Sequence, residues 1–236
     1  FHFGVRVDRI LTDERGVTGI EAAQARIAAD VVVTDADTRT VYNELVEDRR
    51  TRTARQRLNR LQPSFSGFVL MLALSGTTPG IRHHNVWFPQ DYDAEFDALF
   101  AKNPAPVHDP AIYACVPDDP AMRPDGSEAW FILVNAPLHA PPAVYWDTLG
   151  PAYAEHILDV LARRGVDLRE RLQWSQIRTP ADLERTTASP GGSIYGVSSN
   201  GRLSTVLRPS NRSAVPGLYL VGGSAHPGGG LPLVGM

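Results

Sequence analysis

Alternating and apolar stretches near the start of the chain indicate β-structure. Residues 5–10 alternate between apolar and polar side chains, and residues 17–20 and 25–27 resume the pattern after turn residues. Residues 31–33 are three consecutive valines. A period of two, interrupted by turns, predicts a β-meander that leads into a buried strand.

Helical spacing of apolar side chains appears further along the chain. It runs from residue 38 to 61, and Asp35 or Asp37 just before it is interpreted as a helix cap. The clearest helix surrounds residues 153–161, and Gly165 is placed to end it. Two shorter helices are predicted at residues 93–100 and 179–184.

The middle of the chain holds longer apolar runs that predict a second sheet. Residues 68–74 are the longest of these and suit a buried central strand. The run is far shorter than the roughly 18 apolar residues of a membrane span. Further strands are predicted at residues 81–87, 112–116 and 130–134.

The last stretch combines a short apolar run with a cluster of glycines. Residues 218–221 predict a short buried strand, which leads into Gly222 and Gly223 and then into residues 227–230. Glycines after a strand let the backbone approach a ligand closely, and a helix after them would supply free N–H groups. The chain stops at Met236, where such a helix should begin, so we expect a fragment or truncated product.

Composition and charge narrow the class of protein. The chain has 236 residues, 43% hydrophobic and 21% charged, which is typical of a soluble globular protein. A formal net charge of −3 predicts no nucleic-acid partner. Cys115 is the single cysteine, which excludes an internal disulfide or a cysteine metal cluster. Without a signal peptide or membrane span, a cytoplasmic protein is expected.

The adjacent His83 and His84 are the most obvious candidates for metal ligands. They fall in a predicted strand, where neighbouring side chains point to opposite faces. A chelating pair is therefore not expected, and no metal site is predicted.

An arginine-rich segment allows two interpretations. Residues 49–60 contain six arginines within a predicted amphipathic helix. Such a segment can bind an anionic membrane surface, or it can simply be the solvated face of a helix.

Four blocks, in the same order, resemble a known family. They are residues 29–37, 190–196, 208–213 and 219–232, and the last block is the most specific. The blocks look like bacterial carotenoid desaturases, the phytoene dehydrogenase-like family of FAD-dependent oxidoreductases. The last resembles that family's C-terminal flavin-binding signature.

The resemblance implies a mixed α+β fold in two interleaved domains. A substrate-binding domain with a mixed β-sheet and flanking helices is expected over residues 42–189. Residues 1–41 and 190–236 are expected to be pieces of an FAD-binding domain, Rossmann-like and of the amine-oxidase type, whose N-terminal part is absent.

The resemblance also implies FAD as the cofactor of the longer protein. Val7 belongs to a pattern that passes the adenine in this family, and Tyr195 is expected near the flavin ring and the substrate. No Gly-x-Gly-x-x-Gly fingerprint occurs in the chain, so this fragment alone is expected to bind FAD weakly or not at all. The expected cofactor contacts are Val7, Gly222, Gly223, His226, Pro227, Gly228, Gly229, Gly230, Leu231 and Pro232.

Desaturation of a polyene removes a hydride and a proton from adjacent carbons, and a flavin can accept the hydride. The protein must supply a long apolar channel, for which the candidate wall residues are Phe68, Leu70, Trp87 and Trp130. Ordinary core packing is the alternative for these side chains. His226 either moves a proton or stabilises charge, or it hydrogen-bonds the glycine turn as a structural residue.

The sequence therefore predicts the C-terminal portion of an FAD-dependent carotenoid desaturase, inactive by itself. The alternatives are a related flavoprotein isomerase, saturase or ketolase, or a non-catalytic lipid-binding fragment. The expected partners are a lipophilic carotenoid and a membrane surface that the protein contacts peripherally.

Overall fold

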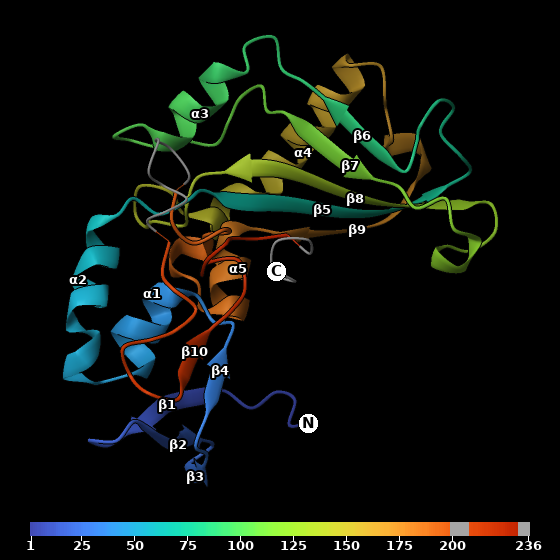
Figure 1. Ribbon diagram of the computed structural model, residues 1–236. Helices are drawn as coiled ribbons and strands as arrows, with labels where there is room; N and C mark the ends of the chain where they lie inside the picture. The colour runs from blue at the N-terminus through green and yellow to red at the C-terminus, as the bar shows by residue number, and fades with distance from the viewer. Residues whose placement is uncertain (199–207, 231–236) are drawn as a thin grey trace. The chain divides into compact units, whose positions relative to one another are not determined.

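The computed structural model of the chain describes residues 1–198 and 208–230 (Figure 1). They form two compact units, unit 1 from residues 1–64 and 185–236 and unit 2 from residues 65–184. Both units contain strands and helices, so the predicted mixed α+β class is confirmed. The predicted roles of the two interleaved domains stay predictions.

Unit 1 begins with the meander that the alternating pattern predicted. Strands β1 (Val7–Thr12), β2 (Val17–Ala22) and β3 (Ala25–Ala28) pair antiparallel in that order. The carboxylate of Asp13 accepts hydrogen bonds from the backbone N–H groups of residues 15 and 16, which closes the first turn.

Two short strands from opposite ends of unit 1 pair in parallel and lie side by side in Figure 1. They are β4 (Val32–Thr34) and β10 (Leu218–Leu220). Leu218 and Leu220 are fully buried, as predicted. The prediction of a buried strand at residues 31–33 is wrong, because β4 pairs with β10 alone among the described strands and leaves Val33 60% exposed.

The predicted helix over residues 38–61 is broken in its middle. Val46 is extended and forms a parallel bridge with Ile10 of β1, which ends the first helical part. Asp48 then caps a new helical start. The helical parts are α1 (Thr38–Thr40), a π-helical turn (Val41–Leu45), a 3₁₀ turn (Arg49–Thr51) and α2 (Arg52–Arg60).

Unit 2 is built on a five-stranded antiparallel sheet with the order β6-β7-β8-β5-β9. The long apolar run lies in β5, an interior strand as predicted, whereas β6 begins three residues later than the predicted strand. The strands are β5 (Ser66–Ser75), β6 (His84–Trp87), β7 (Ile112–Cys115), β8 (Ser127–Ala136) and β9 (Leu172–Arg178).

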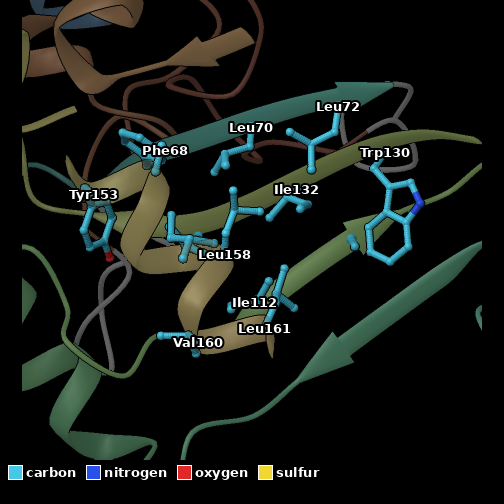
Figure 2. Packing of buried hydrophobic residues seen from close by; sticks show 14 of the residues in the cluster. Phe68, Leu70, Leu72, Ile112, Trp130, Ile132, Tyr153, Leu158, Val160 and Leu161 are labelled. Atoms are coloured by element: carbon cyan, nitrogen blue, oxygen red, sulfur yellow. The ribbon is translucent and has the colours of Figure 1, made fainter. Parts of the chain in front are cut away.

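Helix α4 (Trp146–Arg163) covers one face of this sheet, and the core lies between them (Figure 2). Ile157 and Leu161 are fully buried against alternate residues of β5 and β8, among them Leu70 and Ile132. The helix ends as predicted at Gly165, which has a φ of 90°. The N–H of Val166 donates to the carbonyl of Leu161, which satisfies the last turn.

Helices α3 (Asp93–Phe100) and α5 (Pro180–Thr187) also form as predicted. Thr179 and Asp182 exchange hydrogen bonds between side chain and backbone at the start of α5, a reciprocal cap. Glu95 of α3 is buried, and its carboxylate accepts bonds from the N–H of Ala111 and from Asn135, so the buried charge has partners.

Truncating the buried face of α4 should destabilise unit 2. Leu161→Ala should lower the free energy of unfolding by about 2–5 kcal/mol, because the fully buried side chain leaves a cavity. Urea unfolding followed by tryptophan fluorescence reports on unit 2 alone, because the four tryptophans lie between residues 65 and 184.

The matched control is Leu149→Ala, the same change in the same helix at a side chain that is 37% exposed. It should cost less than about 1 kcal/mol. An equal decrease in the free energy of unfolding for the two variants would contradict the assigned packing of α4.

Candidate functional site

The glycine-rich segment follows β10 at the edge where β4 also ends. Parallel strands place their carboxyl ends together, and ligands of α/β sheets bind at that edge. A Cβ added to Gly222 would lie 3.5 Å from the Cβ of Asp35, which follows β4. The two chain segments therefore stay close beyond the strands, where the N–H of Val221 also donates to the carbonyl of Thr34 at 2.9 Å.

A mostly apolar pocket of about 350 Å³ lies beside β4 in unit 1. The structure places Val7, the expected adenine contact, in its wall together with Ile10 and Asp35. The pocket is large enough for one flat ring system. Its other lining residues are Arg6, Ile20, Val32, Val33, Thr34, Ala36, Thr40, Leu45 and Ala188.

Tyr195 lies against the terminal glycine turn, although more than thirty residues of sequence separate them. A Cβ added to Gly229 would be 3.1 Å from Cδ1 of the Tyr195 ring, too close without movement. Tyr195 has a φ of 67° and is 48% exposed. A bulky residue in this left-handed conformation is strained, and such strain is concentrated at functional sites. The structure thus brings together two of the predicted site segments.

Arg208 holds these two segments together, and sequence reasoning did not assign it a role. Its Nη1 donates hydrogen bonds of 2.8 Å to the carbonyl of Tyr195 and of 2.8 Å to the carbonyl of Gly223. Partial burial lowers the pKa of the guanidinium from its ordinary value, but Arg208 remains a cation at neutral pH. The only signal in the sequence was its place in the block at residues 208–213.

Asn211 and Pro209, from the same block, fix the turn further. The Asn211 side-chain amide donates to the carbonyls of Leu220 and His226, at 3.0 and 2.7 Å. The N–H of His226 donates to the carbonyl of Pro209 at 2.8 Å. The His226 backbone is held from both sides, whereas its side chain is exposed.

The other predicted cofactor contacts are placed as follows. Gly223, Pro227 and Gly230 belong to the same turn, and Gly228 packs against the Arg208 guanidinium, with a hypothetical Cβ 3.4 Å away. Leu231 and Pro232 lie outside the described residues.

The first turn of α1 is joined to the glycine segment through Ser224. The N–H of Thr38 donates to the buried Ser224 hydroxyl at 3.1 Å. Asp37 is the helix cap, as interpreted from the sequence, and accepts a bond from the N–H of Arg39. Burial raises the pKa of the Asp37 carboxyl.

The four predicted channel residues lie on the face of the sheet that α4 covers. Phe68, Leu70 and Trp130 are at most 2% exposed, and Trp87 stacks on Trp130 with ring centroids 6.3 Å apart (Figure 2 labels all but Trp87). They therefore pack as core, which was the alternative interpretation. Alternation places Met71 on the opposite face.

That opposite face of unit 2 is only partly buried. Met71 of β5, Phe131 of β8 and Cys115 of β7 are in register across it. Phe131 is 41% exposed, and Leu133 and Tyr113 beside it are half-buried. An apolar surface of this kind can contact a lipophilic ligand.

The expectation that His83 and His84 point apart is wrong. His83 precedes β6, so strand alternation does not fix its side chain. The two imidazole rings lie 4.5 Å apart, and Cys115 joins them to form a cluster of three metal-ligand side chains.

The whole chain is similar to enzymes that act on carotenoids. It is 30% identical to a 1-hydroxycarotenoid 3,4-desaturase of Flavobacterium sp. (strain P99-3) and 33% identical to a zeta-carotene-forming phytoene desaturase of Myxococcus xanthus. It is 31% identical to a 4,4'-diaponeurosporene oxygenase of Staphylococcus aureus. Each alignment covers 99% of this chain but only 46–47% of the relative, so the chain spans about half the length of these relatives.

The fold also has a counterpart among solved structures. A crystal structure of an oxidoreductase from Methanosarcina mazei matches with a TM-score of 0.57 and 17% identity, over 98% of this chain and 47% of that chain. At this identity the match concerns the fold alone. No family model matches the chain. The resemblance seen in the sequence is confirmed by the curated relatives.

Removing the Arg208 side chain should loosen the turn. In Arg208→Met, amide hydrogen exchange should be faster in peptides that cover residues 193–196 and 222–226. Each lost hydrogen bond to a charged group is worth about 1.5–3 kcal/mol, so local opening should increase by at least about tenfold.

Arg212→Met is the control, because Arg212 is an exposed arginine of the same block. Its exchange pattern at both segments should match that of the parent. If Arg208→Met also matches the parent, these two hydrogen bonds do not hold the turn.

Proposed function

We propose that this chain, which is related along its whole length to carotenoid desaturases, forms the C-terminal portion of an FAD-dependent oxidoreductase that dehydrogenates a long acyclic carotenoid. The observation that carries the proposal is the alignment of 99% of the chain with two desaturases, at 30–33% identity. The contact between Tyr195 and the glycine turn supports it, because it assembles the blocks of the resemblance into one site.

The described residues fit part of an FAD site. The pocket that contains Val7 is mostly apolar and, at about 350 Å³, has room for an adenine ring. The glycines of the turn have no side chains, so a flat ring can approach their backbone closely, as the Tyr195 ring does at Gly229. Parallel sheets are usually covered on both faces, so the exposed Val33 of β4 and the exposed Val31 just before it fit a sheet on which further segments of the longer protein pack.

FAD, when bound, would accept the hydride from the polyene. Arg208 and Asn211 would fix the backbone of the turn so that Gly229 can approach the ring closely. Tyr195 would limit the space beside the turn on the substrate side. The exposed His226 is the titratable side chain of the turn, and we assign it the transfer of the proton to solvent.

The carotenoid would contact the partly exposed face of the unit 2 sheet, with Met71, Phe131 and Leu133 as its apolar surface. Phe68, Leu70 and Trp130 would support this surface from the core side of the same strands, and Trp87 of β6 stacks on Trp130. A polyene has almost no hydrogen-bonding groups, so apolar burial supplies its affinity.

Product analysis separates desaturation from the alternatives. The longer protein would be expressed in a bacterial host that accumulates phytoene, a 1-hydroxycarotenoid or 4,4'-diaponeurosporene. Desaturation predicts a product that has lost two hydrogens and absorbs at longer wavelength. An isomer of unchanged mass, a gain of hydrogen, or a gain of oxygen would instead identify an isomerase, a saturase or an oxygenase such as a ketolase. No new carotenoid in any strain would favour the lipid-binding fragment.

A bulky residue at position 229 should remove the flavin. In the longer protein, Gly229→Val should abolish flavin retention and carotenoid conversion without unfolding, because the branched side chain would extend from the position beside Tyr195 into the space over the turn that we assign to the flavin ring. Flavin absorbance after purification, carotenoid content and the thermal unfolding midpoint measure these three properties.

The double variant Gly229→Val with Tyr195→Ala is the control, because it relieves the clash within the protein. Flavin should remain absent from it if the valine blocks the cofactor directly. A Gly229→Val protein that keeps both flavin and turnover would remove the glycine turn from the proposed site.

We also propose that the protein reaches its substrate by peripheral binding to an anionic membrane. In the described part of the chain, no helix combines the length and apolar character that crossing a bilayer requires. Arg52, Arg57 and Arg60 of α2 are exposed. Arg50 is different: it pairs with Asp48 at 2.6 Å and donates to the carbonyl of Asp13, so it stabilises the fold.

Neutralising the exposed arginines should weaken vesicle binding. The variant with Arg52, Arg57 and Arg60 changed to glutamine should lose up to about 3 kcal/mol of attraction to anionic vesicles, since each arginine contributes roughly 1 kcal/mol. Co-sedimentation at low and high salt is the measurement, because salt screens this attraction.

The control removes the same charge elsewhere by changing the exposed Arg15, Arg82 and Arg163 to glutamine. It should bind like the parent. Equal binding by all three proteins would leave the arginines of α2 as a solvated helix face.

A further inference from the structure

We propose a zinc-binding site formed by His83, His84 and Cys115 at the β6 edge of the unit 2 sheet. A ring nitrogen of each histidine and the Cys115 Sγ all lie within 4.8 Å of one another. Donor atoms around a tetrahedral zinc ion are roughly 3.5 Å apart, given zinc–ligand bonds of about 2.0–2.3 Å. Small rotations of these partly exposed side chains would bring the donors to that distance.

The sheet register is what brings the ligands together. His84 of β6 is paired directly with Cys115 of β7, so their side chains share one face. The carbonyl of His83 accepts a hydrogen bond from the N–H of Val116 at 2.8 Å, which keeps the residue next to the strand pair. Its ring lies beside that of His84. Strand pairing thus brings His84 and Cys115 together, and His83, just before β6, completes the ligand set.

Each histidine also has a second partner that fixes its ring. Nδ1 of His83 lies 3.0 Å from the Asp118 carboxylate, and Nδ1 of His84 lies 2.9 Å from the Tyr113 hydroxyl. Histidines that bind metals usually have such an outer contact, which orients the ring and leaves the other nitrogen for the ion. Asp118 and the Cys115 thiolate together would balance the charge of a divalent cation.

The donor set selects the metal. Two imidazoles and one thiolate suit zinc, whereas Mg²⁺ and Ca²⁺ prefer oxygen ligands. Three protein ligands leave one coordination position for water or a small ligand. A cleft of about 330 Å³ adjoins the cluster and is lined by His83 and Asp118, and also by Arg82 and Arg123. These two arginines make an anion or a water molecule the fitting fourth ligand.

Zinc titration of the full chain, with a chromophoric chelator as competitor, tests the site. The metal-free protein should bind one zinc ion. Cys115→Ala, His83→Ala and His84→Ala should each weaken binding by at least tenfold, whereas His2→Ala, a change at an exposed histidine outside the cluster, should leave it unchanged. With Co²⁺ in place of zinc, the parent should show a thiolate-to-cobalt charge-transfer band that Cys115→Ala lacks.

Two further measurements separate a built site from chance binding. The Asp118→Asn variant should still bind one zinc ion per chain, but with an affinity that is about 10–100-fold lower, since the change removes only the outer contact of His83. Circular dichroism without metal should be the same for all variants, because each change is at a partly exposed side chain. Unchanged zinc affinity in Cys115→Ala, or the absence of a thiolate band with Co²⁺, would overturn the proposal.

Discussion

The parallel pairing of β4 with β10 brings the apolar pocket and the glycine turn of the candidate cofactor site together. Its register joins Val32 to Leu218 and Thr34 to Leu220, so residues almost two hundred positions apart end at one edge. Asp35 then lines the mostly apolar pocket and lies beside Gly222, where an added Cβ would be 3.5 Å from it. The pocket and the glycine turn are therefore neighbours because two short strands share their carboxyl ends, as in other α/β ligand sites.

Local patterns in the sequence predicted most elements, and long-range contacts account for the errors. The β-meander, α3 and the end of α4 at Gly165 depend on spacing and turn residues, which are visible in the chain. The break at Val46 depends on a bridge with Ile10 that no local pattern reveals. The exposure of Val33 likewise depends on which segments pack against β4, and no local pattern shows this.

Site residues were harder to predict, because a strand that is apolar on both faces does not show which face is buried. Phe68 and Met71 are both apolar, yet they lie on opposite faces of β5, and α4 covers only the first. Arg208 stabilises two segments through backbone carbonyls, which carry no sequence signal. His83 lies one residue before β6, so the alternation of strand side chains does not apply to it. The inference that the two histidines point apart and cannot bind one metal therefore fails.

The energies at Tyr195 indicate how the turn is held ready for a ligand. A bulky residue in the left-handed region costs about 1–3 kcal/mol. The two hydrogen bonds from Arg208 reach the Tyr195 carbonyl itself and that of Gly223, and bonds to charged groups contribute about 1.5–3 kcal/mol each. These two hydrogen bonds are therefore strong enough to offset the backbone strain at Tyr195. The restraint acts on the backbone, and Tyr195 as a whole stays 48% exposed, so part of its surface can contact a bound molecule.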